Sequence, residues 1–225
     1  MLFSLIGNGG GLSFLELVLI VFSYVVLVLI MLPVHELAHA WMATKLGDDT
    51  ARWNGRLTFN PFAHLDLWGT MMLFLFGFGY ARPVPVNPRN FQNPKRDMAL
   101  VALAGPLSNL LMAAISLLLY RIVLLLTASA LVIEIAWIVL VWTFASVNVG
   151  LAVFNLLPLP PLDGSRIFGA ILPYRWAMMM DRYSQYIRMA LIVLLATGAL
   201  SKPLNWLSEV VLNGLYRLIG FLPFL

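Results

Sequence analysis

The sequence predicts an all-α polytopic membrane protein, and three observations support this fold class. Hydrophobic residues make up 61% of the 225 residues and charged residues 11%, whereas soluble domains are about half apolar and a quarter charged. Several apolar stretches reach the roughly 20 residues that a helix needs to cross a bilayer. The basic residues gather in two connecting segments, as is typical of the cytoplasmic loops of membrane proteins.

The apolar stretches predict a three-helix core followed by additional C-terminal spans. The core spans are expected at 12–32, 98–120 and 135–157, and the C-terminal helices at 189–200 and 204–225, within 183–225. The two C-terminal stretches are short or interrupted, so they are short or tilted spans, or one of them lies in the membrane interface. The first stretch lacks the basic start and small-residue cleavage site of a secretory signal peptide. We therefore expect one integral-membrane domain over 1–225, with its core at about 12–172.

The distribution of charge predicts an N-terminus outside the cell and two basic loops in the cytoplasm. The basic residues of these loops are Lys45, Arg52, Arg56, Arg82, Arg89, Lys95 and Arg96, then Arg166, Arg175, Arg182 and Arg188. The connection over 121–134 holds one charge of each sign, and no Lys or Arg precedes residue 12. The net charge of +4 therefore indicates membrane topology rather than binding to nucleic acid.

The loop between the first two predicted spans, residues 48–94, is expected to be rich in turns and to dip partly into the membrane. The first helix is expected to continue to about Leu46, where Gly47 ends it. Five prolines between residues 48 and 94 exclude one continuous helix. Residues 68–80 are apolar but too short to span, and they predict a re-entrant segment or a β-hairpin loop. Irregular backbone at membrane depth requires neighbouring protein or a watery cavity, and prolines give 77–87 an extended character.

The sequence His35-Glu36-Leu-Ala-His39 carries the pattern of a zinc site. Residues at i and i+4 share one helix face, so the two imidazoles can bind one ion while Glu36 acts as a general base. The competing interpretation is a helix with polar residues on a packed face. Ionisable side chains at membrane depth are costly and indicate function, which favours the metal site.

A catalytic zinc ion usually takes three protein ligands, so one ligand is missing from the helix. The chain has no cysteine, which also excludes disulfides and leaves His64 or a carboxylate. Asp163 is the best carboxylate, because a proline-rich turn can aim it back into the bundle. Asp66 and Asp97 lie in loop context, and Glu134 is expected on the far side of the membrane. The competing role for Asp163 is that of a helix N-cap.

Two motifs together resemble the site-2 protease family of intramembrane zinc metalloproteases. They are the His35–His39 turn in an apolar helix and the segment Asn155-Leu-Leu-Pro-Leu-Pro-Pro-Leu-Asp163-Gly. The segments 59–70 and 105–109 are also similar to that family. The resemblance covers about residues 33–172. It is closest to the compact bacterial branch, since we find neither an inserted PDZ segment nor trailing CBS domains.

The resemblance implies that His35, His39 and Asp163 hold one zinc ion per chain and that Glu36 activates the attacking water. It implies that Asn155 steadies the substrate carbonyl or its oxyanion, although Asn155 alone could equally be a helix-packing amide. His64 is a gate, a regulatory contact or a plain loop histidine. The expected substrate is the transmembrane segment of another protein in the bacterial inner membrane, cut on the cytoplasmic side.

Peptide bonds within a helix are shielded, so a substrate span must unwind before it is cut. The edge of the extended residues 77–87 can pair with the unwound span.

Two other functions compete with intramembrane proteolysis. A metal transporter would use intramembrane ligands as a conduction path for ions. The sequence shows no internal repeat, which many transporters have, and ion transport would give Glu36 no role. An inactive scaffold that binds helices would not need the intact motif. The substrate, the exact number of spans and the oligomeric state are left open.

Overall fold

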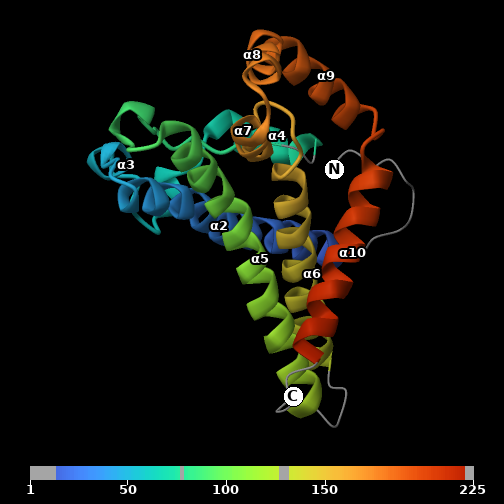
Figure 1. Ribbon diagram of the computed structural model, residues 1–225. Helices are drawn as coiled ribbons and strands as arrows, with labels where there is room; N and C mark the ends of the chain where they lie inside the picture. The colour runs from blue at the N-terminus through green and yellow to red at the C-terminus, as the bar shows by residue number, and fades with distance from the viewer. Residues whose placement is uncertain (1–13, 77–78, 127–131, 221–225) are drawn as a thin grey trace. The chain divides into compact units, whose positions relative to one another are not determined.

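Helices make up nearly all the regular structure of the computed structural model, which describes residues 14–76, 79–126 and 132–220. In chain order they are α2 (Phe14–Lys45), α3 (Thr50–Trp53), η1 (Pro61–Ala63), α4 (Leu67–Phe76), η2 (Pro88–Asn90), α5 (Pro94–Leu126), α6 (Val132–Asn155), α7 (Asp163–Ile171), α8 (Tyr174–Arg182), α9 (Ser184–Ala196) and α10 (Ser201–Gly220) (Figure 1). Within these ranges no strand forms, and one isolated antiparallel bridge joins Leu65 to Ala81. The all-α class is confirmed.

The five predicted apolar helices correspond to α2, α5, α6, α9 and α10. By length and composition, one stretch among the described residues can cross a membrane, Pro94–Val123 of α5. Helices α9 and α10 meet the same criterion only as a pair, with a bend of 85° between them, and Leu140–Asn155 of α6 is apolar but shorter. The start of the predicted first span lies outside the described residues. The number of spans therefore stays a prediction.

Contacts divide the chain into two compact units, one ending at Gly105 and the other beginning at Pro106. The boundary falls inside α5, so a single continuous helix contributes to both units. The prediction of one domain over the whole chain stays a prediction.

The first unit is built on α2, which has 32 residues and contains Pro33 without breaking there. The helix ends at Lys45, next to Gly47, as predicted. The C-terminal part of α2 packs on the start of α5 and on the segment before η2 through a small apolar cluster. Its buried members are Ala43, Phe91 and Val101, and Met42, Leu46, Val86 and Met98 pack against them.

Asp48 ties the two ends of the first loop together. Its carboxylate is fully buried and accepts hydrogen bonds from the backbone nitrogen of Asn87 at 2.7 Å, the side chain of Asn90 at 2.6 Å and the backbone nitrogen of Thr50 at 3.1 Å. Burial alone would raise the pKa of Asp48, but these hydrogen bonds outweigh it and lower the pKa from its ordinary value.

Arg56 holds the middle of the same loop. Its buried guanidinium donates to the backbone carbonyls of Ala63, Arg82 and Pro83, the last two at 3.1 and 2.9 Å. Five donors in a fixed planar fork suit this role, because carbonyls from separate turns need donors in separate directions. The guanidinium therefore fixes residues 82–83 beside 63, although more than 18 residues separate them in sequence.

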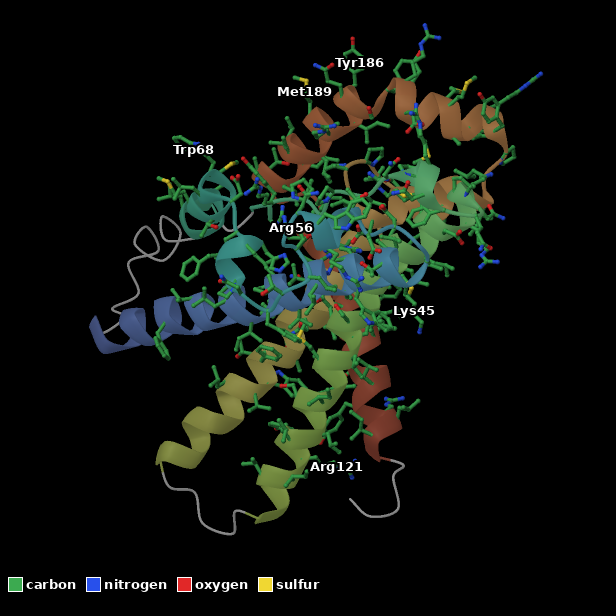
Figure 2. All side chains as sticks on the ribbon, turned by 90° about the vertical axis from the view of Figure 1, so that its left-hand side faces the viewer. Lys45, Arg56, Trp68, Arg121, Tyr186 and Met189 are labelled. Carbon is green, nitrogen blue, oxygen red and sulfur yellow. The ribbon has the colours of Figure 1, made fainter. Side chains whose placement is uncertain are left out.

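The predicted β-hairpin is not found among the described residues of this segment, 68–76 and 79–80. Residues Leu67–Phe76 form the helix α4 instead, whose first turn is closed by a hydrogen bond from the nitrogen of Gly69 to Asp66 Oδ1 at 2.9 Å. Trp68 is 67% exposed and projects outwards from this helix (Figure 2). The re-entrant alternative stays a prediction. Residues 79–87 are non-helical, as predicted, and the first two residues of the extended segment lie outside the described ranges.

The second unit is a bundle of the remaining part of α5 with α6 and α10, which lie side by side (Figure 1). Its buried core is Ala113, Leu117, Ala145, Val149, Val153, Leu212 and Ile219. Alanines at the contact allow the helix backbones to approach closely. Ser116 donates to the backbone carbonyl of Val141 at 2.8 Å, so α5 and α6 are also joined by a hydrogen bond.

Pro158, Pro160 and Pro161 predict that the chain is unwound from the end of the third core span to Asp163. Helix α6 does end at Asn155, but the prediction for Asp163 is wrong. Asp163 is the first residue of α7. The reason is a tight turn that brings the chain back onto itself. A Cβ atom on Gly164 would lie 2.3 Å from the carbonyl oxygens of Leu156 and Leu157, so only glycine allows the helix to start this close to the preceding turn.

Replacing Asp48 with Asn is expected to destabilise the first unit by about 1–3 kcal/mol, because an amide NH2 then faces buried donors. In the wild type, the lowered pKa of Asp48 means that its contribution to stability is complete above the ordinary value of 3.8 and is lost as the pH falls through the lowered pKa. Thermal unfolding in detergent between pH 7 and pH 2 measures both effects.

The matched control for this substitution is Asp49→Asn. Asp49 forms a surface ion pair with Arg52 at 3.1 Å, and both side chains are substantially exposed, so its loss should cost less than about 1 kcal/mol. Equal destabilisation by the two substitutions would show that the buried carboxylate does not hold the loop.

Candidate metal centre

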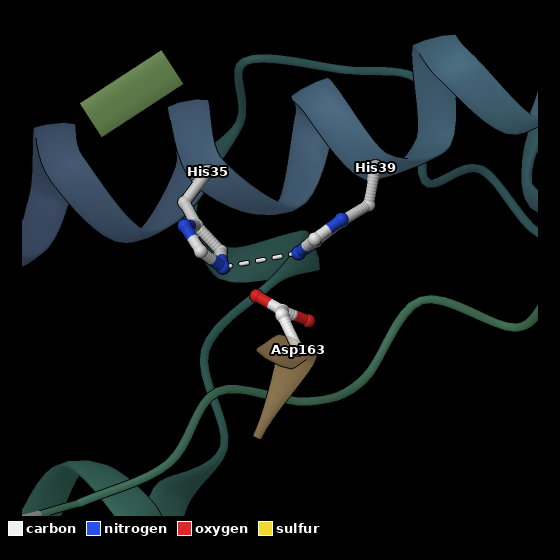
Figure 3. Close-up of side chains that lie close together, drawn as sticks. All are labelled: His35, His39 and Asp163. Atoms are coloured by element: carbon white, nitrogen blue, oxygen red, sulfur yellow. Dashed lines mark hydrogen bonds between the residues drawn. The ribbon is translucent and has the colours of Figure 1, made fainter. Parts of the chain in front are cut away.

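His35 and His39 lie one turn apart on α2 and point to the same side of the helix (Figure 3). Both side chains are buried, with exposed fractions of 6% and 8%. The rings meet edge to face, with centroids 4.6 Å apart and an interplanar angle of 86°. Their Nε2 atoms are 3.0 Å apart. The spacing predicted from sequence therefore brings the two imidazole nitrogens together.

The ring nitrogens have the separation that a shared zinc ion requires. Zinc–nitrogen bonds of about 2.0–2.1 Å at tetrahedral angles place two ligand nitrogens about 3.3 Å apart, close to the observed 3.0 Å. His39 Nδ1 lies 2.7 Å from the backbone carbonyl of Val101. A carbonyl only accepts, so Nδ1 carries the proton and Nε2 presents a lone pair toward His35. This donor set fits zinc.

Gly105 forms a wall of this site within the first unit. A Cβ atom there would lie 2.4 Å from His39 Nε2 and 2.6 Å from His35 Cε1. Helix α5 therefore crosses α2 so closely that only a hydrogen atom fits between its backbone and the two rings. In the sequence, Gly105 belongs to the segment 105–109 that resembles the family; its contact with the imidazoles depends on a helix crossing that the sequence does not show.

Glu36 follows His35 on α2 and is half-buried. Its negative charge interacts with the guanidinium of Arg56. Burial, and then the neighbouring Arg82, lower the pKa of Arg56, and the charge of Glu36 partly opposes this shift. The candidate general base and the cation that fixes the first loop are therefore within electrostatic reach of each other. The candidate base, both histidines and the extended residues 79–87 all belong to the first unit.

Asp163 and Asn155 belong to the second unit. Asp163 is half-buried at the start of α7. The N-cap of α7 is Leu162, in extended conformation, and no side chain caps the helix. Asp163 therefore does not have the N-cap role that competes with metal binding. Asn155 ends α6, and its Nδ2 donates to the carbonyl of Leu151 at 3.0 Å.

The other acidic candidates are engaged at helix starts. Asp66 accepts from the first turn of α4. Asp97 is buried and accepts from the backbone nitrogen of Asn93 at 3.0 Å. The side chain of Glu134 lies outside what the structure describes. One oxygen of each of these two carboxylates therefore serves the first turn of a helix.

His64 is fully buried under the first loop. Its Nε2 lies 2.8 Å from the carbonyl of Thr58, and its backbone oxygen accepts from the nitrogen of Arg82 at 2.8 Å. The Nε2 nitrogen therefore carries the proton and is used inside the loop. The Nδ1 atom is buried and has no hydrogen-bond partner among the described residues, and the role of His64 stays a prediction.

Two buried histidines one turn apart on α2, with Glu36 directly after the first of them, form the His-Glu-x-x-His arrangement typical of a zinc metalloprotease. The family model of peptidase family M50 matches residues 23–128 and 121–197. The chain therefore belongs to peptidase family M50, and it is a zinc metalloprotease of the site-2 type. The family resemblance found in the sequence is confirmed.

Individual relatives agree with this assignment. The chain is 42% identical over 189 residues to "Putative zinc metalloprotease YwhC" of Bacillus subtilis, covering 82% of this chain and 85% of that protein. It is 29% identical over 191 residues to Rip2 of Mycolicibacterium smegmatis, covering 81% and 69%. It is 34% identical over 144 residues to Rip2 of Mycobacterium tuberculosis, covering 60% and 52%. Both Rip2 proteins carry the same description as YwhC. No solved structure matches the chain.

Replacing Gly105 with Ala is expected to displace the imidazoles, because the new Cβ would overlap both rings. Disturbing the groups that orient a zinc ligand typically lowers metal affinity about 10- to 100-fold, and we expect a loss in this range. Zinc content of the purified protein, measured against a competing chelator of known affinity, tests this.

The matched control is Gly150→Ala on α6, where no atom lies within 4 Å of a new Cβ. That substitution should leave zinc affinity unchanged and slightly raise stability, since alanine favours helix over glycine. Unchanged zinc affinity in the Gly105→Ala protein would contradict the close crossing of α5 over the histidines.

Proposed function

We propose that the protein is an intramembrane protease that hydrolyses peptide bonds in or near the transmembrane segments of membrane proteins. The observation that carries the proposal is the buried pair of imidazoles, 3.0 Å apart and oriented by the Val101 carbonyl, in a chain of the M50 family. The Glu36 carboxylate beside it supplies the base that a hydrolase requires and that a metal carrier would not need.

The proposed ligands of one zinc ion per chain are His35, His39 and Asp163. Each offers one atom of a type that zinc binds, two ring nitrogens and one carboxylate oxygen, and three protein ligands are usual at a catalytic site. Support for Asp163 comes from its half-buried position, from the absence of an N-cap role and from the family motif around it. Zinc, when bound, polarises the substrate carbonyl and makes water acidic enough to attack at neutral pH.

Glu36 transfers the proton, and Asn155 stabilises the negative charge that develops on the substrate oxygen. Glu36 accepts the proton of the attacking water and returns it to the amide nitrogen that leaves, so one side chain serves first as base and then as acid. Asn155 turns the second hydrogen of its amide to the oxygen on which negative charge develops. The hydrogen bond to Leu151 uses one of its two N–H groups and leaves the other for this purpose.

We propose that the extended residues 79–87 present the unwound substrate by strand pairing. Arg56 and His64 already engage the polar groups of Arg82 and the Pro83 carbonyl. Pro83 and Pro85 have no N–H group. In this described segment, the N–H groups of Val84 and Val86 have no hydrogen bond, and positions i and i+2 of an extended chain face the same edge. These two donors form the pairing edge.

The proposed location is the bacterial cell membrane, with the active site toward the cytoplasm and the N-terminus outside. The asymmetry of basic residues supports this orientation. His39 is six residues from Lys45 at the end of α2, or about 9 Å along a helix. The metal centre is therefore near the basic end of its helix.

Three substitutions separate the proposed roles. Glu36→Gln should lower cleavage at least about 100-fold and keep zinc, because only proton transfer is lost. Asp163→Asn should lose zinc as well as cleavage. Asn155→Ala should lower kcat about 100- to 1000-fold with zinc retained. Cleavage of a panel of single-span membrane proteins in detergent, together with metal analysis, measures these outcomes.

Asp181→Asn is the control for Asp163→Asn, because Asp181 is an exposed aspartate of the same unit. A chelator should abolish cleavage and added zinc should restore it. If the zinc-loaded wild type cut none of a broad panel, the proposed cleavage of transmembrane segments would be refuted. Zinc transport that persisted in the Glu36→Gln protein would instead identify a transporter.

The pairing edge predicts a difference between two substitutions at Val84. Val84→Pro removes the N–H group but keeps extended backbone, so it should lower kcat/KM about 5- to 10-fold, the cost of one hydrogen bond of roughly 1 kcal/mol. Val84→Ala keeps the N–H group and should retain most of the activity. Equal activities of the two variants would refute pairing through this donor.

A further inference from the structure

A stripe of large exposed side chains runs along α8 and continues onto α9. Its members are Trp176, Met179, Tyr183, Tyr186, Met189 and Val193, and their exposed fractions lie between 46% and 69%. Within each helix, successive members are three or four residues apart, the spacing that keeps side chains on one helix face, and Tyr183 lies at the junction between α8 and α9. Tyr186 and Met189 project from α9 to the same side (Figure 2). We call these six residues the α8–α9 stripe.

Basic side chains flank the α8–α9 stripe. Arg175, Arg182 and Arg188 are exposed, and Asp181 is the single acidic residue between residues 174 and 196, which gives this region a net charge of +2 (three positive, one negative). The Arg182 guanidinium lies 5.9 Å from the ring centroid of Tyr183, and the rings of Tyr183 and Tyr186 are 6.4 Å apart. The cations and aromatic rings therefore alternate along one surface.

A second exposed stripe in the same unit has a different chemistry. Leu107, Leu111, Ile115 and Leu119 follow each other every four residues on α5, with exposed fractions between 49% and 62%. This stripe is purely aliphatic, as expected for side chains against lipid tails. Trp, Tyr and Arg are enriched instead where a membrane meets water. The comparison within one chain assigns the α8–α9 stripe to the interface rather than to the hydrocarbon core.

The lengths of the helices agree with this assignment. Helix α9 has 13 residues, or about 20 Å, whereas the hydrocarbon core is about 30 Å thick. Helix α8, with nine residues, is shorter still. A bend of 85° separates α9 from α10. Neither α8 nor α9 alone can cross the bilayer, but both can lie along its surface.

We propose that the α8–α9 stripe is embedded in the membrane–water interface and that Arg175, Arg182 and Arg188 bind the phosphate groups of anionic lipids. The planar guanidinium donates two parallel hydrogen bonds to a phosphate. The apolar stripe buries itself among the upper acyl chains while the arginines extend to the headgroups. Positive charge beside aromatic and methionine side chains selects a negatively charged lipid surface over a neutral one. This binding to lipid requires a membrane but does not require proteolytic activity.

The chain contains no cysteine, so single cysteines can be labelled without background. Met179→Cys and Tyr186→Cys, each carrying a nitroxide, would be measured in the full-length protein in nanodiscs of phosphatidylcholine with or without phosphatidylglycerol. Collision with oxygen reports lipid exposure, and collision with a water-soluble nickel complex reports water exposure. We expect both labels to favour oxygen when phosphatidylglycerol is present. Leu111→Cys is the reference and should favour oxygen in both lipids.

The arginines are tested by the preference of the protein for phosphatidylglycerol among its bound lipids. Each neutralised arginine should lower this preference about fivefold, so the double variant Arg175→Gln/Arg182→Gln should lower it about 25-fold. Arg89→Gln/Lys95→Gln removes two exposed charges elsewhere and should leave it nearly unchanged. High salt should reduce the preference of the wild type.

Three outcomes would overturn the proposal. Labels at residues 179 and 186 that stay accessible to nickel in every lipid would place the stripe in water. Shielding that is equal in both lipids and unaffected by the arginine substitutions would exclude anionic headgroups as the ligand. Shielding that appears only when two copies share a nanodisc would identify the stripe as a contact between copies of this chain.

Discussion

The contact between Gly105 and the two imidazoles is the constraint on which the first unit depends. At this crossing the backbone of α5 takes the place that a side chain would otherwise fill. The same approach brings the Val101 carbonyl, one turn earlier, within 2.7 Å of His39. One close crossing therefore both confines the rings and sets the tautomer of a ligand, so helix packing and metal chemistry cannot be separated at this site.

The loop after α2 has its own internal support. Asp48 accepts hydrogen bonds from both ends of the loop, and Arg56 donates hydrogen bonds to carbonyls in the middle of the loop. Both groups are buried and charged, which is favourable only because each is surrounded by several partners of opposite polarity. The support leaves the N–H groups of residues 84 and 86 unused. A loop rich in proline is thus held extended without pairing to a sheet.

Sequence predicted those parts of the molecule that depend on local pattern. Apolar runs located the long helices, and spacing located His35, Glu36 and His39. Contacts between distant segments were not predictable, because α4 could equally have been a hairpin from its composition. The start of α7 at Asp163 was missed for a similar reason. The prolines predict the end of α6, but the close approach of Gly164 to the carbonyls of Leu156 and Leu157 depends on how the turn folds back.

The convergence of three carbonyls on Arg56 also has a consequence for local opening of the loop. Residues 63, 82 and 83 share one donor group, so their release from the folded loop is coupled rather than gradual. Loss of the Arg56 guanidinium would therefore loosen stretches that are far apart in sequence at the same time. Asp48 and the backbone of His64 hold the same loop at other points, so exposure of the polar groups of residues 82 and 83 requires several buried hydrogen bonds to break together.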